Sequence, residues 1–126
     1  MGKIQTKKTL LSAFYSFAID GGAISSINMG IMIPIFSIVT RFYVRTITAA
    51  VGSTATIAFG HSADTDAFMV VTGEAMFNAG ETMQGIDFGA NPLLMTAARQ
   101  LQITIATAAL TAGVIQAHIE FTEEDF

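Results

Sequence analysis

The residues of this chain that could do chemistry are few, and the densest group of them lies in one short polar segment. His61, Asp64 and Asp66 bring together an imidazole and two carboxylates. Because carboxylate oxygens suit calcium and an imidazole nitrogen suits zinc, the segment is a weak candidate for a divalent-cation site. Asp and Ser are also ordinary turn residues that bond their own backbone. We therefore favour a polar turn over a metal site.

A second group of ionisable residues lies near the C-terminus. His118 and Glu120 are two positions apart, so they share one face of a predicted strand. Residues 122–126 form an acidic tail that ends on Phe126. Catalytic carboxylates need surroundings that shift their pKa values, and nothing in the sequence encloses this tail. We expect the tail to be solvated or to contact a basic patch on a neighbouring subunit.

Signatures of catalysis are absent from the sequence. It contains no phosphate-binding glycine motif, no GxSxG and no HExxH. Two histidines leave few residues from which to build a nucleophilic triad, and the lack of cysteine excludes disulfides and thiolate metal sites. We expect a protein without enzymatic activity and without a cofactor.

The composition indicates burial against other chains. Hydrophobic residues make up 52% of the 126 residues, with ten phenylalanines and seven methionines, whereas charged residues make up 13%. An ordinary soluble domain has roughly 25% charged residues, and a small fold leaves much of its surface exposed. An oligomer or a larger assembly would cover the excess apolar surface. The net charge of −4 argues against a nucleic-acid partner, which would require a basic face.

The elements that must position the polar residues are β-strands. Alternation of β-branched and aromatic residues is clearest from Pro34 to Thr48. Its inward face would hold Phe36, Ile38, Thr40, Phe42 and Val44, and its outward face would hold Ser37, Val39, Arg41, Tyr43 and Arg45. The outward arginines and tyrosine form either a solvated sheet face or a docking surface.

Several shorter strands with glycine-bearing turns surround this run. They are predicted at Ala23–Ile33 with a bulge or close approach at Gly30, Thr54–Gly60, Ala67–Thr72 (a strand or a turn of helix), Pro92–Ala98, Leu101–Thr107 and Val114–Phe121. The predicted inward residues are Ala55, Ile57 and Phe59 in the second of these strands, Leu101, Ile103 and Ile105 in the fifth, and Ile115, Ala117, Ile119 and Phe121 in the last. The stretch from Gly73 to Asn91 is irregular, and residues 1–22 form an N-terminal arm or a first strand. We predict an all-β fold, an antiparallel β-sandwich or jelly roll with an extended N-terminal arm, in one domain over residues 1–126.

Two targeting interpretations of the N-terminal third are weaker. Lysines followed by the apolar run Leu10–Ile19 imitate a secretory signal, but polar residues interrupt that run. The uncharged run Gly21–Thr40 has the length of a membrane span. It contains Asn28 and Pro34 and leads straight into a strand, so we predict no membrane association.

With the strands placed, several phrases of the chain resemble a group of small tailed-bacteriophage structural proteins. They are Ile38–Val44, Gly52–Gly60, Asp64–Ala67, Leu94–Ala98, Leu101–Ile105, Ala108–Gly113 and Ile119–Phe121. The resemblance implies a β-sandwich virion component, a decoration or auxiliary protein on the capsid, with a trimer as one arrangement. Its partners would be the major capsid protein or other virion proteins, in particles assembled in the host cytoplasm. Such proteins act through surfaces, so the resemblance transfers no functional residues.

Two alternatives to a capsid-stabilising protein remain open at this point. One is a carbohydrate- or receptor-binding module displayed on the virion, in a head fibre or tail component, with the Gly73–Asn91 loop as its site. The absence of tryptophan weakens it. The other is a small hydrolase or metal enzyme built on His61. For the favoured function, the expected contact residues are Phe14, Tyr15, Phe17, Arg41, Tyr43, Arg45 and Phe126.

Overall fold

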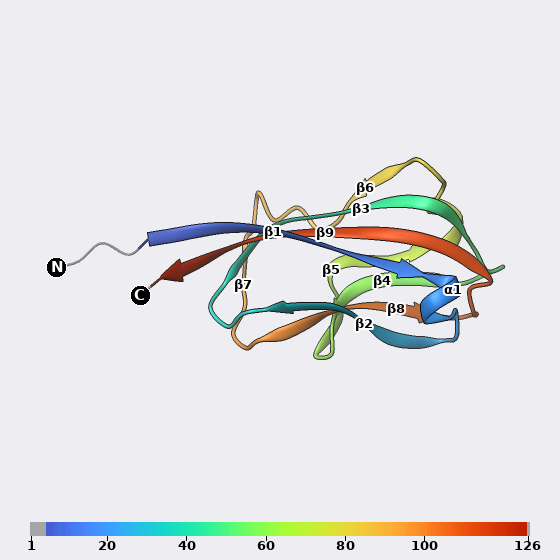
Figure 1. The fold of residues 1–126 in the computed structure, drawn as a ribbon, viewed down its shortest axis with the longest axis horizontal. Helices are drawn as coiled ribbons and strands as arrows, with labels where there is room; N and C mark the ends of the chain where they lie inside the picture. The colour runs from blue at the N-terminus through green and yellow to red at the C-terminus, as the bar shows by residue number, and fades with distance from the viewer. Residues whose placement is uncertain (1–4, 126) are drawn as a thin grey trace.

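Two antiparallel sheets pack face to face in the computed structural model, which describes residues 5–125 (Figure 1). Sheet A has the order β1-β9-β3-β6, with β7 also paired to β3, and comprises β1 (Gln5–Ser16), β9 (Ala112–Asp125), β3 (Ile38–Val51), β6 (Thr82–Gln84) and β7 (Leu93–Leu94). Sheet B has the order β2-β8-β4-β5 and comprises β2 (Ser25–Ile33), β8 (Arg99–Ala106), β4 (Thr56–His61) and β5 (Asp64–Gly73). The predicted all-β antiparallel sandwich is confirmed.

Helical structure is limited to single turns in the described part of the chain. The helix α1 (Phe17–Asp20) follows β1, and the 3-10 turn η1 (Glu74–Met76) follows β5. Within residues 5–125, none of the helices has the length and apolar character needed to cross a membrane.

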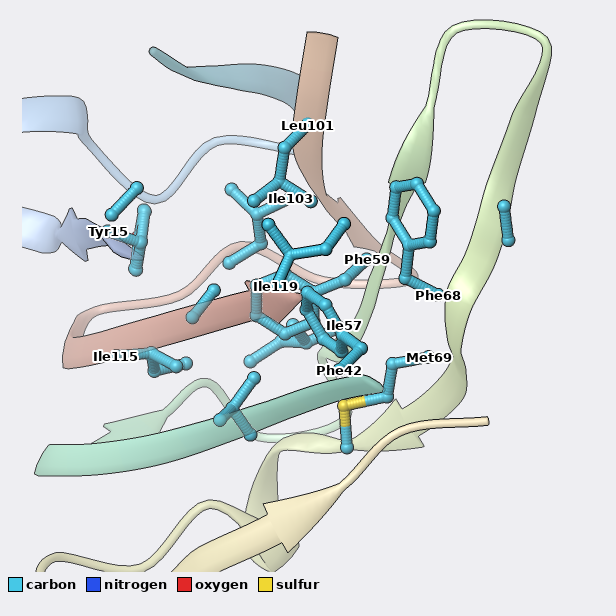
Figure 2. Packing of buried hydrophobic residues seen from close by; sticks show 14 of the residues in the cluster. Tyr15, Phe42, Ile57, Phe59, Phe68, Met69, Leu101, Ile103, Ile115 and Ile119 are labelled. Atoms are coloured by element: carbon cyan, nitrogen blue, oxygen red, sulfur yellow. The ribbon is translucent and has the colours of Figure 1, made fainter. Parts of the chain in front are cut away.

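The core lies between the two sheets and is built by strict alternation along the central strands. On β9, the inward side chains Ile115, Ile119 and Phe121 are at most 1% exposed. On sheet A, Phe42 lies 5.5 Å from Phe59 of sheet B, measured between ring centroids. Figure 2 shows these aromatic and branched side chains filling the space between the sheets. The predicted inward faces of β4, β8 and β9 are therefore confirmed.

The alternation predicted for Pro34–Thr48 is wrong over its first half. Residues 34–37 form a turn, in which the Ser37 hydroxyl donates to the Pro34 carbonyl at 2.6 Å. Phe36 is 61% exposed, whereas Ser37 and Val39 are buried. Ile38 and Thr40 are only half-buried, whereas Phe42 and Val44 point inward as predicted. The cause is a register shift against β9 between Val39 and Arg41, because an extra residue in a bulge exchanges the two faces of a strand.

Of the two alternatives for residues 1–22, an arm or a first strand, the described part of the chain contains the strand β1. β1 pairs with β9 without a register shift, from Gln5 opposite Asp125 to Ser16 opposite Val114. Residues 122–125 of the acidic tail continue β9. The start of β1 and the end of β9 extend together beyond the rest of the sandwich (Figure 1). Lys7 stands opposite Glu123 there, and opposite charges across strands favour this pairing.

Irregular backbone occurs at a bulge in β2 and in the segment between β5 and β7. β2 has its register shift between Asn28 and Met32, and Gly30 inside it has a φ of 81°, which confirms the predicted bulge. The segment between β5 and β7 ties the two sheets together. In it, the Gly85 N–H donates to the Phe42 carbonyl of β3 at 2.8 Å, and the Ile86 N–H donates to the Phe68 carbonyl of β5 at 2.9 Å.

Candidate functional site

The outer face of sheet A gathers the polar and aromatic residues that alternate outward from three neighbouring strands. Because β9 pairs with β1 on one side and with β3 on the other, outward residues form rows across the sheet. The three rows are Arg41, Glu120 and Leu10; Tyr43, His118 and Ser12; and Arg45, Gln116 and Phe14. We call this surface the sheet A face.

The middle row is an aromatic stack. The Tyr43 and His118 rings lie 4.6 Å apart between centroids, with planes 14° from parallel. The Arg41 guanidinium carbon lies 4.8 Å from the centroid of the Tyr43 ring. A cation at this distance is attracted by the electron-rich ring face. These contacts hold three polar side chains in fixed positions on the surface.

The carboxylate of Glu120 in the first row is occupied by contacts within the chain. The Thr40 hydroxyl donates to its Oε1 at 3.0 Å, and the Lys8 Nζ lies 3.8 Å from the same oxygen. The Glu120 side chain is 19% exposed, whereas that of Lys8 is 68% exposed. The lysine therefore remains available at the surface, and the exposed ion pair itself contributes little to stability.

The third row brings a cation beside an exposed aromatic ring. Arg45 is exposed, and Phe14 on β1 is 54% exposed. Burial, and after it the positive charge of Arg45, lower the pKa of His118 below its ordinary value of 6.5. The imidazole of the stack is therefore neutral at neutral pH.

The charge of the sheet A face is opposite to that of the whole chain. The three rows hold Arg41 and Arg45, and Lys8 on β1 lies beside their Glu120, in a chain of net charge −4. Glu120 is the one carboxylate in the three rows. Arginine, tyrosine and other aromatic residues are also the types enriched in protein interfaces. The chemistry of this face fits an acidic protein surface.

A surface pocket opens beside this face at β6. Its volume is about 400 Å³, and it is lined by Arg41, Tyr43, Thr82, Met83 and Gln84. Tyr43 pairs with Gln84, and Arg45 pairs with Thr82. Part of the segment that sequence analysis left as an irregular loop thus borders the face.

The expected contact residues are divided between the surface and the core. Phe14 lies on the sheet A face with Arg41, Tyr43 and Arg45, whereas Phe17 lies outside it, in α1. Phe126 lies outside the described residues.

Tyr15 is not a contact residue in the folded chain. It is 1% exposed, and its hydroxyl donates to the Gly21 carbonyl at 2.6 Å. Burial, followed by the charge of Asp20, raises the pKa of this hydroxyl. Successive side chains of a strand point to opposite faces, so Phe14 lies on the outer face of sheet A and Tyr15 lies in the core.

The weak metal candidate lies in the β4–β5 hairpin. His61 pairs with Asp64, and its Nδ1 accepts a hydrogen bond from the Ala63 N–H at 3.3 Å. A hydrogen bond with Asp64 raises the pKa of the Asp66 carboxyl. In the described part of the chain, no group of three His, Cys, Asp or Glu side chains could hold a metal ion. The structure thus does not assemble His61, Asp64 and Asp66 as a set of ligands.

Sequence reasoning found most of the face but not its assembly. His118 and Glu120 were read as one strand face, and Arg41, Tyr43 and Arg45 as another. The sequence signal for each of these two faces was the spacing of two residues along the strand. Which strands are neighbours depends on a pairing between segments about eighty residues apart, as in Thr40 with Glu120.

Comparisons with known proteins identify the fold. No family model matches the sequence, and no curated protein sequence matches it. Solved structures that contain a similar chain include two bacteriophage capsids. One is the acidic stable capsid structure of Helicobacter pylori bacteriophage KHP30, with a TM-score of 0.66 and 12% sequence identity, covering 98% of this chain and 99% of that chain. The other is the cyanophage Pam1 capsid asymmetric unit, with a TM-score of 0.64 and 13% identity, covering 93% of this chain and 85% of that chain. The chain therefore has the fold of chains found in two bacteriophage capsid structures.

Proposed function

We propose that this chain is a bacteriophage virion structural protein, a decoration or auxiliary protein that binds and stabilises the head shell. The observation that carries the proposal is the shared fold over nearly the full length of a chain in a phage capsid structure. The excess of apolar surface and the scarcity of charge agree with a protein that functions among other chains. Its partners would be the major capsid protein or other virion proteins, with assembly in the host cytoplasm.

The sheet A face is the surface we assign to shell binding. Its fixed Tyr43 and Arg41 and the exposed Phe14 provide the residue types that contribute most to interface energy. Its cations favour an acidic patch on the shell, because complementary charge fixes register and speeds association. The mechanism is binding without chemistry.

Binding to phage heads that lack this chain tests the proposal. Wild-type chain should sediment with such heads and raise the temperature at which they open, since a ligand that binds the intact state stabilises it. Arg41→Glu with Arg45→Glu should weaken binding by at least about tenfold. Arg99→Glu is the charge-reversal control for each single variant, Arg41→Glu or Arg45→Glu, because Arg99 lies on β8 of sheet B. Equal binding by the double variant would refute the assigned face, and no binding by the wild type would refute the function.

The pocket beside Tyr43 favours a second candidate, a carbohydrate- or receptor-binding module on the virion. Gln84 and Arg41 in its lining offer hydrogen bonds of the kind a sugar uses. The Tyr43 ring, however, is already in contact with His118 and Arg41. A glycan-array screen with wild type and Tyr43→Ala tests it. Binding that disappears in the variant supports this candidate, and no binding removes it.

A further inference from the structure

The free edge of β1 is a long strand edge without a partner in the described chain. β1 is the terminal strand of sheet A and pairs only with β9. Leu10 and Phe14 are more than half exposed, and Leu11 is 37% exposed. Residues 9–16 carry no charge. A long apolar edge of this kind pairs readily with another strand, and soluble proteins normally cover or blunt it.

The backbone groups available on this edge can be identified. In an antiparallel strand, successive residues direct their N–H and C=O groups alternately toward the two neighbours. The Ser16 N–H donates to the Asp20 Oδ2 at 3.0 Å, so it points away from β9. Because β1 pairs with β9 without a register shift, the residues at every second position before Ser16 also point outward. They are Thr6, Lys8, Leu10, Ser12 and Phe14.

The Asp20 carboxylate closes this edge at Ser16. An identical strand running antiparallel and centred on Leu11 would pair Lys8 with Phe14 of the second copy, and Leu10 with Ser12. Its Thr6 would lie opposite Ser16, where Asp20 closes the edge. The other four outward-pointing residues would then have partners. A pairing centred on Leu10 would instead move Lys7 and Lys8 away from Asp20.

The charges at the two ends of β1 favour antiparallel pairing of two β1 strands over parallel pairing. Lys7 and Lys8 lie at the start of β1, and Asp20 lies at its end. In an antiparallel pair, Lys7 and Lys8 of each chain lie near Asp20 of the other chain, at the two ends of the paired β1 strands. A parallel copy in register would place Lys7 opposite Lys7, and like charges directly opposite are destabilising.

We propose that two copies of this chain pair through their β1 edges, antiparallel about Leu11, to join two A sheets into one continuous sheet. In this register even-numbered residues pair with even-numbered ones and odd with odd, so paired side chains point to the same side of the joined sheet. The two sheet A faces would therefore lie side by side on one surface. This inference goes beyond shell binding and can fail without it.

The first test measures the mass of the full chain in solution by light scattering. Wild type should have twice the 13.3 kDa of one chain. Ser12→Pro should halve that mass, because the lost N–H is one that points to the free edge. Its melting temperature should stay near that of the dissociated wild type. Ser12→Lys keeps every backbone hydrogen bond and should also halve the mass, because lysines on an edge strand oppose pairing with another strand. This variant provides the test if Ser12→Pro fails to fold.

The second test uses the absence of cysteine from the chain. In the proposed register, Leu11 faces its own copy at a non-hydrogen-bonded position, where Cα atoms lie about 4.5 Å apart. A disulfide spans that distance. Leu11→Cys should therefore form a covalent dimer under mild oxidation. Leu94→Cys, at an exposed leucine of β7, is the matched control and should stay monomeric.

Three results would overturn the proposal. The first is a monomeric wild type, or a trimer that persists in Ser12→Pro. The second is cross-linking of Leu11→Cys that is no faster than that of Leu94→Cys. The third is a Ser12→Pro variant that keeps the wild-type mass but no longer binds phage heads, because the β1 edge would then take a strand of the shell protein. The head-binding assay with the Arg41 and Arg45 variants is unaffected by the first two results, so the proposed function is tested separately.

Discussion

Tyr43 and His118 stack across β3 and β9 with ring centroids 4.6 Å apart, and this contact joins the two strands on the surface that faces away from the core. Arg41 lies against the same tyrosine, and burial, followed by the charge of Arg45, lowers the pKa of the histidine. The stack is thus the centre of the sheet A face.

Stability should fall as the solution is acidified through the histidine range. Burial lowers the pKa of both His118 and His61 below 6.5 in the folded chain. As the pH falls, the histidines of the unfolded chain therefore bind protons before those of the folded chain. The contribution of these histidines to the free energy of unfolding is complete above pH 6.5 and is lost as the pH falls through their folded-state pKa values. His118→Gln should flatten the decline of the melting temperature between about pH 7 and 5. A decline identical to that of wild type would contradict this account.

The influence of Arg45 on this histidine can be measured directly. Arg45→Gln removes the second cause of the lowered pKa, so the pKa of His118 should move up toward its ordinary value. Titration of the imidazole proton signals by NMR measures the change. His61 is the internal control, because the causes of its own shift are burial, Arg99 and Asp64. An unchanged pKa of His118 in Arg45→Gln would refute the assignment.

Core packing between the sheets should dominate the free energy of unfolding. Phe42 is fully buried and contacts Phe59 and Phe68 across the sandwich. Phe42→Ala should cost about 3–5 kcal/mol, since it removes transfer energy and leaves a cavity. Phe36→Ala is the matched control at an exposed position and should change stability by less than about 0.5 kcal/mol. Urea denaturation of both variants measures the difference, and similar costs would contradict the packing described.

The sequence predicted the inward faces where a strand is regular, as for Ile115 to Phe121 on β9. The prediction was wrong between Phe36 and Thr40, because one bulge exchanges the faces and alternation alone does not reveal a bulge. Pairing of β1 with β9 was missed for a different reason. It is a contact between the two ends of the chain, and periodicity contains no information about which strands are neighbours. The sheet A face depends on that same pairing.

Two glycines in sheet B should respond differently to the same added methyl group. A Cβ on Gly60 would overlap the Asp64 carbonyl oxygen, because the chain turns back into β5 there. A Cβ on Gly73 has no atom within 4 Å. Gly60→Ala should therefore destabilise the fold by more than about 1 kcal/mol, whereas Gly73→Ala should be neutral or stabilising by up to about 1 kcal/mol. Thermal unfolding of both variants measures this, and equal effects would contradict the close approach.

The exposed turn at Phe36 stores backbone strain that a single substitution should release. Phe36 has a φ of 66°, which is uncommon for a residue with a side chain, and it is 61% exposed. Its N–H donates to the Met95 carbonyl at 2.7 Å, which holds the turn in place. Phe36→Gly removes the steric cost, keeps that hydrogen bond and loses little buried area. The strain released, roughly 1–2 kcal/mol, exceeds the entropic cost of glycine, roughly 0.5–1 kcal/mol, so the variant should be more stable by up to about 1 kcal/mol. Ile35→Gly, at an exposed neighbour without a positive φ, should destabilise it instead, because glycine adds entropy to the unfolded chain. Urea denaturation of the two variants decides between them, and a loss of stability in Phe36→Gly as large as that in Ile35→Gly would show that the turn is not strained.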